Sequence, residues 1–307
     1  MSARAWTALG LVYVVWGSTY LAIRYVVESL PPLLSAGSRF LTAAALLSAY
    51  LLVRRGRSAF RVTRRQAGAA AAVGLLLLLG GNGGVTLAER ADLPSGLTAL
   101  LVAAVPLWVV LLRAAARDRP SPRTVVGVAL GLVGLAVLLL PGARPEGVAL
   151  GAVVTVLGSS VLWACGSVLA SRADLPADGL LTTVLEMLAG GAGLVAAGLL
   201  RGEVLDPAAV ERSSVVALGY LVVFGSLVAF TAYSWLLGNA PISWVATYAY
   251  VNPVVAVGLG ALFVGEQVTG TTLAGGALTL LAVAVVVAEE GRRRRAATGA
   301  PVDAPST

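Results

Sequence analysis

The stretch from residue 95 to residue 112, SGLTALLVAAVPLWVVLL, decides the fold because none of its side chains is charged. A helix needs about 20 mostly apolar residues to cross a hydrocarbon layer roughly 30 Å thick. The run lies between Asp92 and Arg113, two charges that belong in the polar layers on either side. It therefore predicts a membrane-spanning helix over residues 95–116.

Apolar runs of the same kind fill most of the chain. Of its 307 residues, 58% are hydrophobic and 12% are charged, and the mean hydropathy is +0.89. A soluble domain carries roughly 25% charged residues, so the solvent of this chain must be lipid. We predict an all-α membrane protein with ten transmembrane helices. They span residues 5–27, 33–53, 67–88, 95–116, 123–141, 147–170, 179–200, 214–237, 243–264 and 270–289.

The two ends of the chain differ in character. The first run begins at Ala5 and lacks the charged start and the small-residue cleavage site of a signal peptide, so we expect a retained helix. Residues 291–307 contain four consecutive arginines followed by small and polar residues. We expect a basic, disordered cytoplasmic tail there.

The arginines predict how the helices are oriented. Sixteen arginines lie at the N-terminus, in alternate loops and in the tail, and four lie in the opposite loops. Cytoplasmic loops of membrane proteins carry the excess of basic residues, so both termini are predicted to be cytoplasmic. Basic clusters such as residues 54–65 then face anionic lipid. Nucleic acid is not an expected partner.

Rare residues recur at one constant spacing, which indicates an internal repeat. The pairs 147 residues apart are Trp16 and Trp163, Arg39 and Glu186, Pro94 and Pro241, and Pro106 and Pro253. Each half, residues 1–141 and 147–290, holds five predicted spans. Because five is odd, the second half must insert with the opposite topology. Inverted repeats are the architecture of secondary transporters, with the binding site near the bilayer midplane.

Several short stretches resemble one transporter family. They are WGSTY at residues 16–20, Pro31-Pro32, Arg39-Phe40, Gly81-Asn82-Gly83, Val105-Pro106 and YAYVNP at residues 248–253. In order and spacing they are similar to the EamA family of the drug/metabolite transporter superfamily, especially its YedA-like bacterial inner-membrane branch. The resemblance covers residues 5–290. It implies ten helices in two inverted repeats, a central cavity, a place in the bacterial cytoplasmic membrane, and export of metabolites such as amino acids.

Two ionisable residues lie well inside predicted spans, where charge is costly and therefore indicates function. Arg39 is about six residues into the second span and Glu186 about seven into the seventh. Arg39 has the planar donor geometry that receives a carboxylate. Glu186 would receive an ammonium group or carry a coupling proton. The alternative for both residues is a structural role, in an ion pair or in hydrogen bonds to neighbouring helix carbonyls. Glu89 and Glu266 lie near span ends, and we interpret them as loop charges.

Backbone irregularities near mid-depth predict hinges. Pro106 and Pro253 each leave a carbonyl without its helical donor, here on Val102 and Ala249. Such a carbonyl needs another partner or a wet cavity. In the third span, glycines surround Asn82, and the hinge candidates there are Gly81 and Gly83.

Polar and aromatic side chains within spans are the remaining candidates for substrate contact. The ninth span is the richest in them, and a cavity wall of Tyr and Asn suits a polar substrate with some apolar body. Trp16 lies at the centre of its span, and the sequence does not decide whether it lines the cavity or packs against a neighbouring helix. The candidates are Trp16, Tyr20, Asn82, Trp163, Thr247, Tyr248, Tyr250 and Asn252.

A secondary transporter explains the repeat, the broken helices and the buried charges together. A membrane-embedded enzyme would need a nucleophile, a base or metal ligands, but the chain has no histidine and one cysteine, so we expect no catalytic residue, metal or cofactor. The sequence has no phosphate-binding loop of the kind that would indicate ATP-driven transport. A channel is a further alternative, which a saturable flux would exclude.

The expected activity is export of small polar metabolites by alternating access, with amino acids or related compounds as the expected substrates. Proton coupling through Glu186 is one hypothesis. Facilitated diffusion of drug-like or nucleoside-type solutes is the alternative, because only one carboxylate is predicted well inside a span. The expected partners are the lipid bilayer, a small-molecule substrate and, with coupling, protons. The sequence leaves the oligomeric state open.

Overall fold

The computed structural model describes residues 3–116, 120–139, 148–239 and 248–298, and in this part of the chain every regular element is a helix, without a strand. The elements of the first half are α1 (Ala3–Ser29), α2 (Pro32–Arg55), η1 (Arg57–Phe60), α3 (Arg64–Gly74), η2 (Leu75–Asn82), α4 (Gly83–Arg90), α5 (Ser95–Val102), α6 (Val105–Ala115) and α7 (Pro122–Leu139). Those of the second half are α8 (Leu150–Ala170), α9 (Gly179–Leu200), α10 (Arg212–Tyr220), η3 (Leu221–Val228), α11 (Ala229–Asn239), α13 (Tyr248–Val264) and α14 (Gly270–Thr298).

Eight helical stretches within the described residues are long and apolar enough to cross a membrane, and two shorter apolar helices lie at Pro122–Leu138 and Tyr248–Val264. Three of the eight stretches join several elements: α3 with η2 and α4, α5 with α6, and α10 with η3 and the start of α11. The chain is therefore a helical, multi-pass membrane protein, as its composition predicts.

Most helix bounds agree with the predicted spans to within a few residues, and the two larger differences have local causes. The third span begins at Arg64 because Thr63 and Gln66 form a capping box, each side chain accepting from the other's backbone N–H at 3.1 Å. The last helix continues to Thr298 instead of ending at 289. Arg292 pairs with Glu289 one turn earlier, at 3.5 Å. The prediction of a disordered tail is wrong for residues 291–298.

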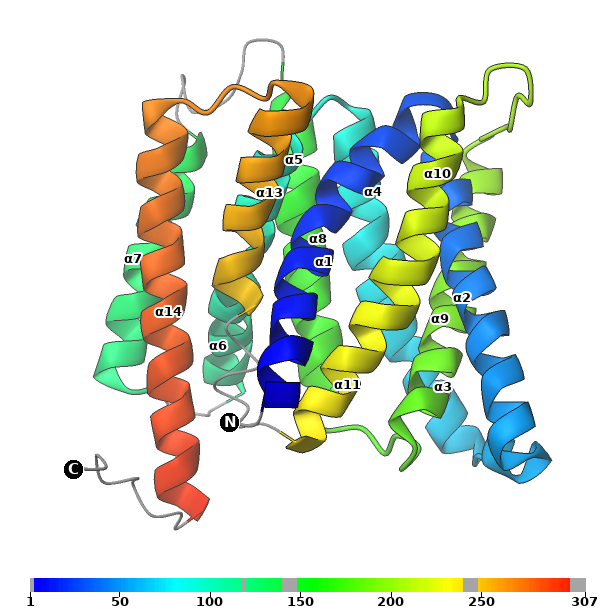
Figure 1. Cartoon of the computed structure of the whole chain (residues 1–307). Coiled ribbons are helices and arrows are strands. Elements are labelled where there is room, and N and C mark those ends of the chain that lie inside the picture. The colour runs from blue at the N-terminus through cyan, green and yellow to red at the C-terminus, as the bar shows by residue number, and fades with distance from the viewer. Residues whose placement is uncertain (1–2, 117–119, 140–147, 240–247, 299–307) are drawn as a thin grey trace.

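Two helix pairs pack closely at opposite sides of the bundle, α7 with α14 and α2 with α9 (Figure 1). Small residues permit this closeness. A Cβ added at Gly37 of α2 would lie 2.9 Å from the carbonyl oxygen of Gly191 on α9. Between the pairs, α1 crosses the middle of the molecule (Figure 1) and contacts α10, α11 and α13. Close approach through small residues is typical of membrane helices.

Corresponding helices of the two halves begin at nearly constant spacing. The starts of α1 and α8, and of α2 and α9, are 147 residues apart, and those of α7 and α14 are 148 apart. The members of each pair run in opposite directions in Figure 1: α1 and α7 rise where α8 and α14 descend. The start of α1 and the end of α14 lie at the same end of the molecule.

Two spans contain π-helical segments, η2 and η3, whose starts are 146 residues apart. A third span is interrupted between α5, which ends at Val102, and α6, where Pro106 occupies the first turn. Pro253 lies inside α13. Segments of π-helix in α-helices are frequent at functional sites. These irregularities occur at the depth where the predicted hinges lie.

Acidic side chains from the second half cap helices of the first. Glu203 accepts from the backbone N–H groups of Leu33 and Leu34, at 3.0 Å and 2.9 Å, where α2 begins. Glu266 accepts from those of Ser95 and Gly96, at 2.6 Å and 3.0 Å, where α5 begins. The free N–H groups and partial positive charge of a helix start favour such carboxylates. The prediction of Glu266 as a plain loop charge is therefore wrong.

Candidate functional site

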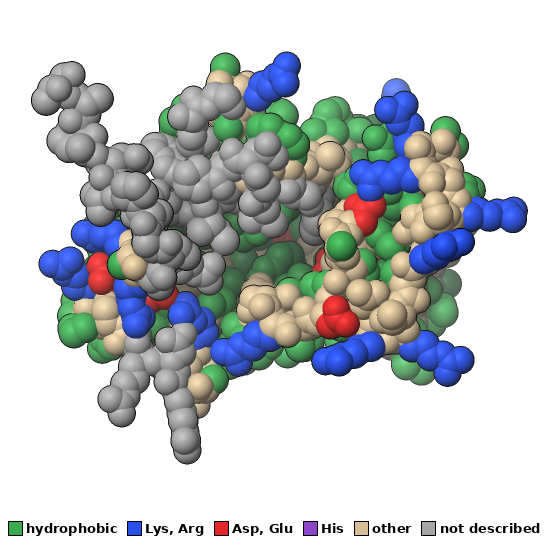
Figure 2. All heavy atoms as spheres, turned by 90° about the horizontal axis from the view of Figure 1, so that it is seen from below, with side chains coloured by type: hydrophobic (Ala, Val, Ile, Leu, Met, Phe, Trp, Pro, Cys, Tyr) green, Lys and Arg blue, Asp and Glu red, His purple; other side chains and the backbone are tan. Residues whose placement is uncertain are grey.

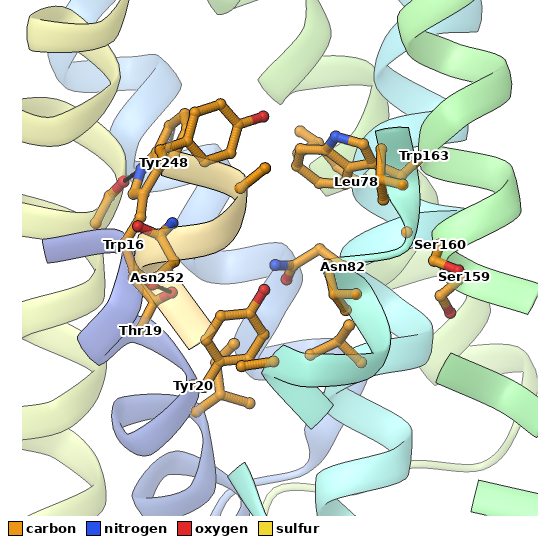
Figure 3. A pocket seen from close by; sticks show the side chains of 18 of the residues that line it. Trp16, Thr19, Tyr20, Leu78, Asn82, Ser159, Ser160, Trp163, Tyr248 and Asn252 are labelled. Carbon is orange, nitrogen blue, oxygen red and sulfur yellow. Dashed lines mark hydrogen bonds between the residues drawn. The ribbon is translucent and has the colours of Figure 1, made fainter. Parts of the chain in front are cut away.

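A cavity of about 160 Å³ lies among the helices of both halves. This space would hold on the order of ten water molecules, so it suits a small metabolite. In Figure 3, Trp16, Tyr248 and Asn252 lie on one side of the cavity and Trp163 and Asn82 on the other. The sequence-predicted residues that line it are Trp16, Tyr20, Arg39, Gly81, Asn82, Pro106, Trp163, Tyr248, Asn252 and Pro253.

Four predicted residues are not part of this lining. Glu186 is half-buried on α9 and makes no hydrogen bond with any described residue, although its charge acts on Tyr233. Tyr250 packs against an apolar cluster that includes Leu100 and Leu101. Gly83 packs beside Leu194. Thr247 lies outside the described residues.

Arg39 is a buried cation at the cavity wall, only 6% exposed. Its Nε donates to Ser226 Oγ at 3.0 Å, and its guanidinium carbon lies 4.7 Å from the centre of the Phe40 ring. Within the described residues, no acidic side chain lies within 4.0 Å of it; the ion pair with Glu186 that the sequence left open is not formed. Its charge is therefore available to an anionic group in the cavity.

The cavity also offers acceptors along its wall. Asn82 has a buried Oδ1 without a hydrogen-bond donor among the described residues. Val102 and Ala249, whose carbonyls Pro106 and Pro253 leave without a helical donor, both line the cavity. Asn252, with its amide oriented to satisfy its neighbours, donates to the backbone carbonyls of Tyr13 and Tyr248, both at 3.2 Å.

An aromatic cluster of Trp16, Tyr233 and Tyr248 borders the cavity. The ring centres are 5.0 Å apart for Trp16 and Tyr233, 5.2 Å for Trp16 and Tyr248, and 5.8 Å for the two tyrosines. Trp16 Nε1 donates to the carbonyl of Gly225 at 3.2 Å. Such offset and edge-on ring pairs stabilise an arrangement beyond the area they bury. The cluster joins α1, α11 and α13 beside the cavity.

Sequence reasoning missed several polar contributors. Ser226 and Tyr233 lie seven residues apart in one span, a spacing that puts them on one helix face, and this was the available signal. Ser159 and Ser160 line the cavity one turn before Trp163. Ser160 also accepts a hydrogen bond from Trp108 Nε1 at 2.8 Å.

The prediction that Glu89 is a loop charge is also wrong. The sequence places it near the end of a span and suggests a solvated loop charge. It is completely buried in the last turn of α4, at 0% exposure. The helices α8, α1 and α2 pack on α4 and cover the end of this span, which hydropathy alone does not reveal.

Comparisons with known proteins agree with this architecture. The sequence profile described as "EamA-like transporter family" matches residues 5–140 and 150–288. The "Uncharacterized inner membrane transporter YedA" of Escherichia coli (strain K12) is 42% identical over 262 residues, which cover 85% of this chain and 83% of that protein. The "Probable amino-acid metabolite efflux pump" of Salmonella typhimurium is 26% identical over 281 residues, covering 88% and 90%.

A solved crystal structure shares the fold, with a TM-score of 0.62 at 22% identity, and it covers 96% of this chain and 99% of that one. The profile matches both halves of the chain, and the similarity to the inner-membrane transporter covers most of its length. The chain is a multi-pass protein of the cytoplasmic membrane, and it belongs to the EamA-like transporter family.

Proposed function

We propose that residues 1–141 and 147–290 are two inverted repeats of five spans each, with both termini in the cytoplasm and a basic tail after them. The constant spacing of helix starts and the opposite directions of paired helices support this. The two shorter apolar helices, added to the eight long stretches, bring the spans to the ten predicted. Figure 2 views the face where α1 begins; arginines lie around its edge, as expected of a cytoplasmic face.

The activity we propose is export of small polar metabolites by alternating access, with amino acids or related compounds as the substrates. The observation that carries the proposal is Arg39. A buried guanidinium without an acidic partner is costly, and it is retained here at the wall of a cavity. A substrate carboxylate entering the cavity would supply the missing charge and accept from the terminal nitrogens in a planar, two-bond arrangement.

The rest of the wall suits the other parts of an amino acid. Asn82 Oδ1 is a buried acceptor without a donor among the described residues, which favours a substrate ammonium or hydroxyl group. Trp16, Trp163 and Tyr248 provide apolar faces for a side chain. The relative from Salmonella typhimurium is named "Probable amino-acid metabolite efflux pump", which agrees with this class of substrate.

Alternating access requires the cavity to open to each side in turn. The face seen in Figure 2 is hollowed near its middle, which fits a cavity open toward the cytoplasm for loading. The prolines at residues 106 and 253 and the π-helical segments lie at the cavity or next to it. They provide points at which helices bend without losing further backbone hydrogen bonds.

Export against a gradient requires an energy source, and we propose inward movement of protons. Glu186 is the candidate proton site on the cytoplasmic side, since it is half-buried without a hydrogen-bond partner among the described residues. Its charge acts on Tyr233, a member of the aromatic cluster at the cavity. Proton binding at Glu186 would therefore alter the electrostatics beside the substrate.

The test is efflux of radiolabelled amino acids from proteoliposomes that contain the purified full chain, with and without an imposed pH gradient. We expect saturable efflux that increases with the gradient and is abolished by excess unlabelled substrate. Efflux that does not saturate would indicate a channel. Efflux of nucleosides or drug-like solutes only, unaffected by the gradient, would replace the proposal with facilitated diffusion of that class.

A further inference from the structure

Glu89 is a carboxylate that the proposed function does not use. Its side chain is 0% exposed, and neither carboxylate oxygen has a hydrogen-bond donor among the described residues. An ionised carboxylate in such surroundings is strongly unfavourable unless it is paired and hydrogen-bonded. A neutral carboxyl group, with its proton attached, avoids most of that cost. The surroundings of Glu89 in this conformation therefore favour the protonated form.

The cations around Glu89 make no hydrogen bond or ion pair with its carboxylate, and the Arg24 charge acts on it only at longer range. Arg24 of α1 donates to the backbone carbonyl of Glu89 at 3.0 Å and to Asp92 Oδ1 at 3.1 Å, and among the described residues it forms no ion pair with the Glu89 carboxylate. Arg90 is occupied by the carbonyl of Val27 at 2.7 Å. Both neighbouring cations are thus committed elsewhere.

Negative charge approaches Glu89 from the other half of the chain. The Glu266 carboxylate lies within electrostatic range and is held at the start of α5 by two backbone N–H groups. Arg24 and the Tyr20 hydroxyl, both on α1, are the other titratable groups that interact electrostatically with Glu89. Of the remaining elements packed on α4, η2 and α8 carry no charged residue, and Arg39 of α2 is bonded to Ser226.

We propose that Glu89 is a proton-binding site whose occupancy follows the opening and closing of the protein at the end opposite the termini. Opening that end would hydrate the carboxylate and release one proton to the adjacent solution. Closing it requires one proton to bind a carboxylate oxygen, with no other bond made or broken. The coupling rests on the alternating access proposed above.

The position of Glu89 links this site to the cavity. Tyr20 lines the cavity and interacts electrostatically with Glu89. Val85, one helical turn before Glu89 and on the same face of α4, also lines it. A change at Glu89 therefore reaches the substrate space through two neighbouring side chains. Glu186 lies in the first half of α9, a helix that begins at the end of the molecule where the chain termini are (Figure 1). Glu89 lies in the last turn of α4, so the two carboxyls are separate sites.

Infrared difference spectroscopy of the full chain in lipid nanodiscs tests the protonation directly. In the parent we expect a band from a protonated carboxyl group at neutral pH, and we expect Glu89→Gln to remove it. Glu28→Gln is the matched control, because Glu28 is exposed at the same end of the molecule, and it should leave the band unchanged. The Glu186→Gln variant shows whether the Glu186 carboxyl group also contributes to this band. A Glu89→Gln spectrum identical to that of the parent would overturn the proposal.

Cysteine labelling tests the link to opening. In a Cys165→Ser background, Leu93→Cys places a thiol at a buried position between α4 and α5. A membrane-impermeant maleimide reacts with the thiolate, so its rate rises about tenfold per pH unit from ionisation of the introduced thiol alone. While the closed form dominates, the proton linked to opening should add about a further tenfold per unit of outside pH. Glu89→Gln should keep only the slope that comes from thiol ionisation. Equal slopes in the parent and in Glu89→Gln would contradict the linkage.

The two proposals fail separately in these experiments. If the infrared band and the labelling slope depend on Glu89 but no solute efflux is found, the proton site is supported and the proposed function is contradicted. If efflux is saturable but the infrared band and the labelling slope do not depend on Glu89, the proposed function is supported and the proton site is contradicted. Thermal unfolding of each variant in detergent identifies one that does not fold, and Glu89→Leu, which also lacks an ionisable group, then replaces Glu89→Gln.

Discussion

Arg39 of α2 donates from Nε to Ser226 Oγ of η3 at 3.0 Å, and this bond joins the two halves of the chain at the cavity wall. Ser226 is 1% exposed, so the bond is shielded from water. It holds the guanidinium plane in one orientation, with the terminal nitrogens left for another partner. A serine in a π-helical segment thus positions the residue that we propose binds substrate.

Replacing Arg39 with Gln should weaken the binding of carboxylate-bearing solutes. A hydrogen bond to a charged group contributes about 1.5–3 kcal/mol, so half-saturation of efflux should require about ten to a hundred times more solute. The measurement is the concentration dependence of efflux from proteoliposomes. Arg201→Gln, an exposed change, should leave it unaltered. An unchanged half-saturation in Arg39→Gln would show that the guanidinium is structural.

Replacing Glu186 with Gln should separate transport from the proton gradient. The amide keeps the shape of the side chain but cannot bind and release a proton, so we expect efflux that no longer responds to an imposed pH gradient. Solute exchange at equal pH should continue. Glu211→Gln is the control, because Glu211 is exposed. If the variant keeps the parent's response to the gradient, Glu186 is not the coupling site.

Replacing Pro106 with Ala should slow transport and stabilise the protein. Alanine restores a backbone N–H that can reach the carbonyl of Val102 and join α5 to α6 in one helix. We expect a higher unfolding temperature in detergent and a lower maximal efflux rate. Pro122→Ala changes a proline at the start of α7, where no helical bond is lost, and should alter neither. A normal efflux rate in the Pro106→Ala variant would show that Pro106 does not act as a hinge.

Replacing Gly37 with Ala should destabilise the contact between α2 and α9. The added methyl group would lie 2.6 Å from Val195 Cγ2 and 2.9 Å from the carbonyl oxygen of Gly191. Overpacking of this kind costs about 1–3 kcal/mol, measured as the loss of unfolding free energy in detergent. Gly10→Ala meets no atom within 4 Å and should stabilise α1 slightly, by up to about 1 kcal/mol. Equal effects of both changes would contradict this packing.

The sequence was informative about spans and about the character of the site. Uncharged runs such as residues 95–112 predict helices that the structure contains with nearly the same bounds. Scarce residues inside those runs, among them Arg39, Asn82 and Trp163, line one cavity. They were recognisable because a polar or kinked residue in lipid is costly and needs a reason to be there.

The sequence was misleading where burial depends on distant segments. Glu89 lies near a span end, so hydropathy predicts a solvated charge, yet α1 and the other helices packed on α4 bury it completely. Ser226 and Tyr233 do not stand out in the sequence, because serine and tyrosine are common in membrane helices without a functional role. Their importance comes from Arg39 and Trp16, which are about two hundred residues away in the chain.

By itself, the sequence determined that the chain enters a membrane, which segments cross it, and which few residues are costly there. Only the tertiary structure decided which face of each helix meets the cavity, a neighbouring helix or lipid. The physical reason is that lipid tails and the packed interior are both apolar. A helix between them lacks the strong two-sided pattern that water imposes on soluble helices, so its orientation is set by packing.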